Sequence, residues 1–409
     1  MVSFIIPERI TEFAIDEGGY VENLEVLIEQ IRDKNIDLRA LPNSSLAYGS
    51  QATLIPSGFL GLIGIDALRS LRIVSWGYAT LSLFTLYLLL RKVTIRSHAD
   101  KNSFNSILPF LILTTYSIWP SYTLWSLLGL RESAVVFGVI LSFFAITTLK
   151  EKTSENLKLR NYVTSCSLLF CGLSILFMSR EALAYLTIFC LIFPIALGSL
   201  RRNSALFMIV ATLCSFFFYL STLREPFKDS SNKEVNSITK IGATEITSVT
   251  QNISVKSIIR SQQSRAVGAN NVIWKNDCYN PEFQTLSELI ATAECISKAA
   301  LGAYIKPLPW SSKTSNIYLL AAWENLLWIL LYCAFAFSII FQFFRKRLNL
   351  ITYSLLFYFS SYHALLAIYS GSLGSLFRHK STLFWIMLLF IYSSLQIKID
   401  DRIRNSMLY

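Results

Sequence analysis

Long apolar runs, each of roughly 16 to 25 residues and almost free of charge, recur along this chain from about residue 73 onward. A helix rises ~1.5 Å per residue, so about 20 such residues cross the ~30 Å hydrocarbon core of a bilayer. Only 15% of the 409 residues are charged and 53% are apolar. This apolar fraction is too high for a soluble enzyme of this size. Because strand-like alternation is absent, the runs predict an all-α polytopic transmembrane bundle.

The apolar runs predict about nine transmembrane helices, joined by loops that carry most of the Lys and Arg residues. The expected spans are residues 73–90, 106–128, 132–149, 161–178, 182–199, 204–221, 317–344, 349–370 and 382–397. Alternate loops are basic, as at Arg201-Arg202 and Arg345-Lys346-Arg347. Basic loops stay in the cytoplasm, so the formal net charge of +11 reflects membrane topology and anionic lipid headgroups, and no nucleic-acid partner is expected.

These spans divide the chain into four parts. Residues 1–72 form an external N-terminal segment with amphipathic helices, and residues 73–221 hold the first six transmembrane helices. Residues 222–316 form a long external loop, and residues 317–409 hold the last three helices and a cytoplasmic tail. Within the external loop, apolar residues at helical spacing from Pro281 to Ala303 predict an amphipathic helix lying on the membrane surface.

Two of the seven cysteines, Cys278 and Cys295, share the external loop. The other five fall within expected spans, where cysteine packs as a small apolar side chain. In an oxidising compartment, a disulfide between Cys278 and Cys295 would contribute ~3 kcal/mol by restricting the unfolded chain. Two independent free thiols are the alternative.

Three tight turns between apolar runs carry an arginine on the side opposite the basic loops. They are Arg131-Glu132, Arg180-Glu181 and Arg378-His379-Lys380. An arginine at such a depth must either reach the lipid headgroups or neutralise an anion. Guanidinium groups bind phosphate oxygens in pairs, so the turns predict a phosphate-binding cluster to which His379 and Lys380 add charge. Each arginine could instead cap its helix or pair with the neighbouring glutamate.

Three carboxylates outside these turns are further candidates. Asp16 and Glu17 lie on the same external side, where a carboxylate would suit a general base that deprotonates a sugar hydroxyl. An acidic cap on a surface helix explains this pair equally well. Glu324 lies inside an expected span, and a carboxylate within a membrane is a functional candidate. Nothing ahead of Asp16 is long enough to span a membrane, so we expect a first helix to be missing from this chain or its start codon to be placed too late.

The sequence shows no metal-ligand spacing and no glycine-rich phosphate loop, so a zinc or haem site is not expected. The part that a divalent metal could play is left open.

Several short motifs resemble those of a known class of membrane enzyme. The longest is Trp119-Pro-Ser-Tyr-Thr-Leu-Trp-Ser-Leu-Leu-Gly-Leu-Arg-Glu-Ser133, preceded by Ile65-Asp-Ala-Leu-Arg69. Further landmarks are Pro307-Leu-Pro-Trp310, Trp323-Glu-Asn-Leu-Leu-Trp328 and Gly371-Ser-Leu-Gly-Ser-Leu-Phe-Arg-His-Lys380. With these stretches the chain resembles the integral-membrane glycosyltransferases of the GT-C class and the related O-antigen and exopolysaccharide polymerase-like proteins of bacteria.

The resemblance implies a multi-pass protein of the bacterial inner membrane that transfers glycan from a polyprenyl-phosphate- or diphosphate-linked donor on the periplasmic face. It implies an acidic residue in the first outer loop, which corresponds to Asp16 or Glu17. Arg131, Arg180 and Arg378 would then stabilise the leaving lipid phosphate. Membrane lipid, a polyprenyl-linked glycan and other polysaccharide-assembly proteins would be the partners.

Three alternatives are kept. A transferase that adds a single sugar or a decorating group would differ from a polymerase only in its acceptor. A lipid-linked oligosaccharide flippase should line a central cavity with its cationic groups. A non-catalytic envelope subunit would leave the three arginines far apart.

Overall fold

The computed structural model describes residues 15–42, 47, 49–95, 103–151, 159–199, 308–309, 316–345, 348, 350–369 and 378–406. These residues form helices and no strand. Four helical segments within them are long and apolar enough to cross a membrane, namely Ala67–Lys92, Tyr162–Ile192, Ala322–Phe344 and Arg378–Lys398. The all-helical class is thus confirmed and the chain is marked as a membrane protein, whereas the full set of expected spans stays a prediction.

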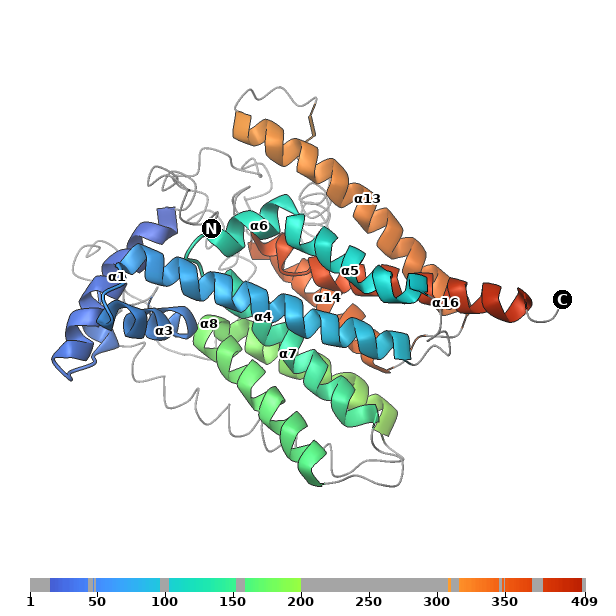
Figure 1. The fold of residues 1–409 in the computed structure, drawn as a ribbon, viewed down its shortest axis with the longest axis horizontal. Helices are drawn as coiled ribbons and strands as arrows, with labels where there is room; N and C mark the ends of the chain where they lie inside the picture. The colour runs from blue at the N-terminus through green and yellow to red at the C-terminus, as the bar shows by residue number, and fades with distance from the viewer. Residues whose placement is uncertain are drawn as a thin grey trace, which may run out of the picture.

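The described residues form eleven helical elements in chain order. They are α1 (Ile15–Arg32), the 3-10 turn η3 (Leu38–Ala40), α3 (Gln51–Leu62), α4 (Ala67–Ile95), α5 (Ser103–Ile118), α6 (Pro120–Leu127), α7 (Glu132–Glu151), α8 (Leu159–Ser199), α13 (Asn316–Phe344), α14 (Leu350–Tyr369) and α16 (Phe384–Ser406). Figure 1 shows α1 and α3 at one end of the longer helices.

The N-terminal helix α1 is fixed to this end by one apolar face. Tyr20, Leu24 and Leu27 recur at helical spacing and are buried. They pack in a small core with Leu71 of α4 and Leu128, which lies just after α6. The apolar face of α1 is therefore covered by protein.

Helix α7 lies at the centre of the bundle, with α4 and α8 packed against it. It is apolar all round and its residues are buried along most of its length, as expected for a helix with protein on several sides. A Cβ atom at Gly138 would lie only 2.9 Å from the carbonyl oxygen of Gly172 in α8. Small residues at this contact let the two backbones approach closely, as is common between membrane helices.

Helix α8 contains the expected turn between spans 161–178 and 182–199. Arg180 has non-helical backbone angles, φ −156° and ψ 94°, within an otherwise helical segment. Figure 1 shows the chain folding back there into two arms. The first arm packs on α7 through Gly172, and the second packs on α14, where the rings of Phe189 and Phe357 lie 5.6 Å apart.

The expected span 106–128 is wrong as a single helix, because the structure divides it into α5 and α6. Trp119 between them has extended angles, φ −63° and ψ 125°. Pro120 explains the break, since a proline disfavours helical geometry in the residue before it and suits the first position of a new helix.

Several expectations fall outside the described residues. They are the span 204–221, most of the external loop with the amphipathic helix from Pro281 to Ala303, and the Cys278–Cys295 disulfide. The described cysteines, Cys166, Cys171, Cys190 and Cys333, are free thiols.

Candidate functional site

The three arginine turns meet at the end of the bundle that carries α1 and α3. Glu132 is the first residue of α7, and its Oε1 atom lies 3.2 Å from Arg180 Nη2 at the reversal of α8. The same oxygen lies 3.1 Å from Nε of Arg378, which precedes α16. We call Arg131, Glu132, Arg180 and Arg378 the arginine cluster.

Arg131 completes the cluster from the residue before α7. Its Nη1 donates a hydrogen bond of 2.8 Å to the carbonyl oxygen of Gly49, just before α3. The guanidinium also lies close enough to act electrostatically on both Glu132 and Arg180. The hydrogen bond to Gly49 therefore ties the cluster to the N-terminal helices.

The cluster carries more positive than negative charge. Among the described residues, the three guanidinium groups of the cluster face the one carboxylate of Glu132, so these four side chains together carry two more positive charges than negative ones. The side chains are largely shielded from solvent, with exposed fractions of 21% for Arg180, 17% for Arg378 and 5% for Glu132. An excess of charge in such a place is costly unless an anion binds there.

The cluster also holds polar atoms without a partner. Arg131 Nε and Arg180 Nε are buried and have no hydrogen-bond partner among the described residues, and Glu132 Oε2 has none either. Most buried polar groups in proteins are hydrogen-bonded, so orphaned donors beside excess positive charge point to a bound ligand with acceptor oxygens.

His379 lies beside the cluster and is oriented by two neighbours. Its Nε2 atom lies 3.3 Å from Arg180 Nη1, and its Nδ1 atom lies 3.5 Å from the hydroxyl of Tyr362 in α14. A guanidinium can only donate, so Nε2 accepts and the proton of the neutral ring is on Nδ1. The structure thus places His379 with the arginines, as expected.

Lys380 reaches a different group of polar side chains in α13. Its Nζ atom donates to Asn325 Oδ1 over 3.1 Å, and both residues are fully buried. Glu324, the intramembrane candidate, is next in sequence to Asn325. Its Oε1 atom accepts from the Ser121 N–H at 3.3 Å and from Trp328 Nε1 at 3.1 Å. We call Glu324, Asn325 and Lys380 the α13 polar group.

Glu17 is fully buried below the cluster and is engaged on both oxygens. Arg72 Nε lies 3.0 Å from Oε1, and Arg72 Nη2 lies 3.2 Å from Oε2. The N–H of Gly129, in the turn before Arg131, donates to Oε1 at 3.1 Å. These contacts favour a structural role for Glu17, which ties α1 to α4 and to the arginine turn. Asp16 lies in α1, and its side chain is outside the described residues.

Sequence reasoning gave no role to Tyr20 or Arg72. The Tyr20 hydroxyl accepts a hydrogen bond of 3.1 Å from Ser50 Oγ and lies within the electrostatic reach of Arg131 and Glu132. Burial raises the pKa of Tyr20, and the positive charge of Arg131 opposes this rise. The phenol therefore stays neutral beside the charged cluster. Because Tyr20 falls at helical spacing on the apolar face of α1, its sequence position predicts a core residue and gives no sign that its hydroxyl lies near the arginine cluster.

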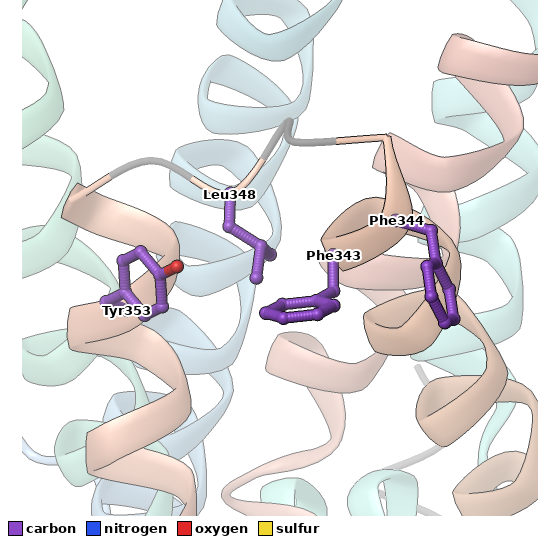
Figure 2. Close-up of a pocket in the computed structure, with 4 residues that line it drawn as sticks. All are labelled: Phe343, Phe344, Leu348 and Tyr353. Carbon is purple, nitrogen blue, oxygen red and sulfur yellow. The ribbon is translucent and has the colours of Figure 1, made fainter.

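Two further features bear on the site. Among the residues that the structure describes, no group of three or more His, Cys, Asp or Glu residues could hold a metal ion. A cavity of about 330 Å³ lies between Phe343, Phe344, Leu348 and Tyr353 (Figure 2). Phe343 is about 28 Å along α13 from Glu324, so this cavity is at the opposite end of the bundle.

Comparison of the chain with protein-family models, with curated proteins and with solved structures found no match.

Proposed function

We propose that this chain is a membrane glycosyltransferase whose arginine cluster binds the phosphate of a polyprenyl-phosphate- or diphosphate-linked sugar. The observation that carries the proposal is the meeting of Arg131, Arg180 and Arg378 around the single carboxylate of Glu132. Excess positive charge and buried donors that have no partner among the described residues suit a phosphate, whose oxygens accept several charge-assisted hydrogen bonds.

The position of the cluster favours a lipid-linked phosphate. Helices that carry it at their ends are apolar enough to lie in hydrocarbon, where a polyprenyl tail would also lie. A phosphate attached to that tail would then stand at the helix ends, within reach of the guanidinium groups. A soluble phosphate would gain nothing from the apolar helices.

The proposed reaction is displacement at the anomeric carbon of the bound sugar. The acceptor hydroxyl oxygen forms a bond to that carbon as the bond between carbon and phosphate oxygen breaks, and the electron pair leaves with the phosphate. Arg131, Arg180 and Arg378 would stabilise the charge that grows on this leaving group. Asp16 would take the proton of the hydroxyl, since Glu17 is committed to Arg72. Glu132 would hold the guanidinium groups in place.

The reaction proposed here would occur on the periplasmic face of a bacterial inner membrane and extend a surface polysaccharide. The basic loops at the other ends of the helices support this orientation.

A lipid-linked oligosaccharide flippase is the second candidate, and the α13 polar group is the observation that favours it. Transporters place ionisable groups inside the membrane, and Lys380 and Glu324 are both buried in apolar segments. Transfer produces a new glycosidic bond and flipping does not, so analysis of the products separates the two.

The test is turnover of a lipid-linked donor by the purified chain in lipid nanodiscs. We expect Arg180→Ala to lower turnover a hundredfold or more, because loss of one preorganised donor costs ~3 kcal/mol at the transition state. Arg180→Lys should restore only part of the activity, since it keeps the charge and loses the fork of donors.

Arg69→Ala is the matched control. Arg69 lies at the same end of the bundle, but its side chain is 67% exposed and pairs with Asp66 on the surface. Its variant should turn over donor at the wild-type rate. Near-normal turnover by Arg180→Ala, Arg131→Ala and Arg378→Ala at matched expression would overturn the proposal.

A further inference from the structure

Tyr20 of α1 carries a buried hydroxyl at the edge of the arginine cluster. Its side chain is only 2% exposed, and its hydroxyl oxygen accepts a hydrogen bond of 3.1 Å from Ser50 Oγ. Gly49, the residue before Ser50, accepts a hydrogen bond of 2.8 Å from Arg131 Nη1 on its carbonyl oxygen. Two neighbouring residues of the chain therefore hold the phenol of Tyr20 and the guanidinium of Arg131 near one another.

The charges of the cluster act on this hydroxyl. Arg131, Glu132 and Arg378 all lie within electrostatic reach of Tyr20. Burial raises the pKa of Tyr20, and this effect is larger than the opposing effect of Arg131. The phenol therefore keeps its hydrogen at neutral pH, beside a site with excess positive charge.

The hydroxyl hydrogen of Tyr20 can form a second hydrogen bond. A tyrosine hydroxyl has one O–H donor in addition to its acceptor lone pairs. The bond from Ser50 uses the Tyr20 oxygen as the acceptor and leaves the O–H hydrogen to donate to another group. Nε of Arg131 and Nε of Arg180 are buried donors that have no partner among the described residues. Neutral and charged donors thus collect at one place, as a ligand with several acceptor oxygens requires.

We propose that the Tyr20 hydroxyl donates a hydrogen bond to the phosphate of the lipid-linked sugar, beside Arg131. This role rests on the proposed function of the arginine cluster and adds to it a binding residue from α1. A phosphate has several acceptor oxygens, so it can bind a phenol and guanidinium groups together, and a hydrogen bond to an ionised oxygen is stronger than one between neutral groups. A phenol supplies this bond without adding a further positive charge to the buried cluster.

The test is equilibrium binding of farnesyl phosphate, a short polyprenyl phosphate, to the full chain in lipid nanodiscs. Farnesol, which has the same tail and no phosphate, is the comparison ligand, and binding to empty nanodiscs is subtracted. The wild type should bind farnesyl phosphate roughly tenfold more tightly than farnesol or better, because only the phosphate forms charge-assisted hydrogen bonds. Tyr20→Phe removes the O–H group and keeps the ring, so it should weaken binding of farnesyl phosphate about tenfold, the loss typical of one hydrogen bond to a charged group. Binding of farnesol should not change, whereas damage to the fold would weaken both ligands.

Tyr78→Phe is the matched control. Tyr78 also reaches α3, but its hydroxyl donates a hydrogen bond of 2.9 Å to the Ala52 carbonyl oxygen, so its hydrogen is already used. Tyr78→Phe should bind farnesyl phosphate as tightly as the wild type. An equal loss of affinity in Tyr78→Phe and Tyr20→Phe would overturn the proposal.

Ser50→Ala decides the outcome if Tyr20→Phe fails to fold. Ser50 precedes α3, and its side chain forms no capping hydrogen bond to that helix. The substitution therefore removes the hydrogen bond that orients the phenol and takes no cap from α3. It should weaken binding of farnesyl phosphate by a smaller factor than Tyr20→Phe and leave binding of farnesol unchanged. Wild-type affinity for farnesyl phosphate in both variants would overturn the proposal.

Arg180→Ala separates the role of Tyr20 from the proposed function. If Arg180→Ala weakens binding of farnesyl phosphate and Tyr20→Phe does not, the cluster binds phosphate without Tyr20, and the role of Tyr20 is overturned alone. If the wild type binds farnesyl phosphate no more tightly than farnesol, the phosphate site and the role of Tyr20 are both overturned.

Discussion

Nε of Arg378 lies 3.1 Å from Oε1 of Glu132, although Arg378 precedes α16 and Glu132 begins α7. The same carboxylate oxygen lies 3.2 Å from Arg180 Nη2. One glutamate therefore joins three separate segments of the chain at one point. Because the ion pairs are largely buried, they fix the positions of the guanidinium groups and neutralise part of their positive charge.

Replacement of that glutamate should destabilise the fold. Glu132→Gln leaves the guanidinium groups of Arg180 and Arg378 without their carboxylate, and breaking a buried ion pair from one side costs about 3–5 kcal/mol. The measurement is the free energy of unfolding in mixed micelles with increasing denaturing detergent.

Glu181→Gln is the control for Glu132→Gln. Glu181 follows Arg180 in sequence, is only half-buried, and accepts a hydrogen bond of 3.2 Å from the Tyr185 hydroxyl. The amide oxygen of glutamine can accept the same bond, so this variant should stay within ~0.5 kcal/mol of the wild type. Equal losses of unfolding free energy in Glu132→Gln and Glu181→Gln would show that Glu132 does not stabilise the fold through its ion pairs.

The ion pair between Glu17 and Arg72 should contribute far more than a similar pair on the surface. Glu17 is buried and meets Arg72 through two hydrogen bonds, whereas Asp66 and Arg69 form a pair of 3.1 Å with exposed fractions of 50% and 67%. We expect Glu17→Ala to cost about 3–5 kcal/mol of unfolding free energy and Asp66→Ala to cost less than about 1 kcal/mol. A small loss for Glu17→Ala, measured in the same detergent titration, would contradict the anchoring role.

The apolar runs predict the four helical segments that are long and apolar enough to cross a membrane, because the length and composition of a membrane span are local properties of the sequence. The turn at Arg180 could be predicted for the same reason, since a charged pair interrupts an otherwise apolar run. The Trp119–Pro120 break carried an equally local signal in its proline, and the prediction of one span across it gave hydropathy too much weight.

Ion pairs between residues that are far apart in the sequence could not be predicted from local hydropathy. Arg72 lies just outside the expected span 73–90, because an arginine lowers hydropathy, yet α4 begins at Ala67 and includes it. Its charge is matched by Glu17 from another helix, and only tertiary packing reveals that partner. The arginine cluster is similar: the sequence predicted that its members share one side of the membrane, but the central place of Glu132 depends on how α7, α8 and α16 meet.

Close packing of α7 against α8 should not tolerate a larger residue at Gly138. A Cβ there would lie 2.8 Å from Leu176 Cγ and 2.9 Å from the Gly172 carbonyl oxygen, which is backbone and cannot move aside alone. Gly138→Ala should therefore cost about 1–3 kcal/mol of unfolding free energy through overpacking. Gly77→Ala is the control, because a Cβ at Gly77 has no atom within 4 Å and alanine favours a helix. Gly77→Ala should be as stable as the wild type or slightly more stable. A larger loss of unfolding free energy in Gly77→Ala than in Gly138→Ala would contradict the packing argument.

The two ends of the bundle should face opposite sides of the membrane. Asn35 follows α1 at the end that carries the arginine cluster and is exposed, whereas Asn349 follows the basic run between α13 and α14. With the native cysteines replaced, Asn35→Cys should react with a membrane-impermeant thiol reagent in spheroplasts. Asn349→Cys should react only after the membrane is permeabilised, because basic loops stay in the cytoplasm. Both variants should be labelled in detergent, which controls for accessibility. Labelling of Asn349→Cys but not Asn35→Cys in intact spheroplasts would place the arginine cluster on the cytoplasmic face and contradict transfer on the periplasmic side.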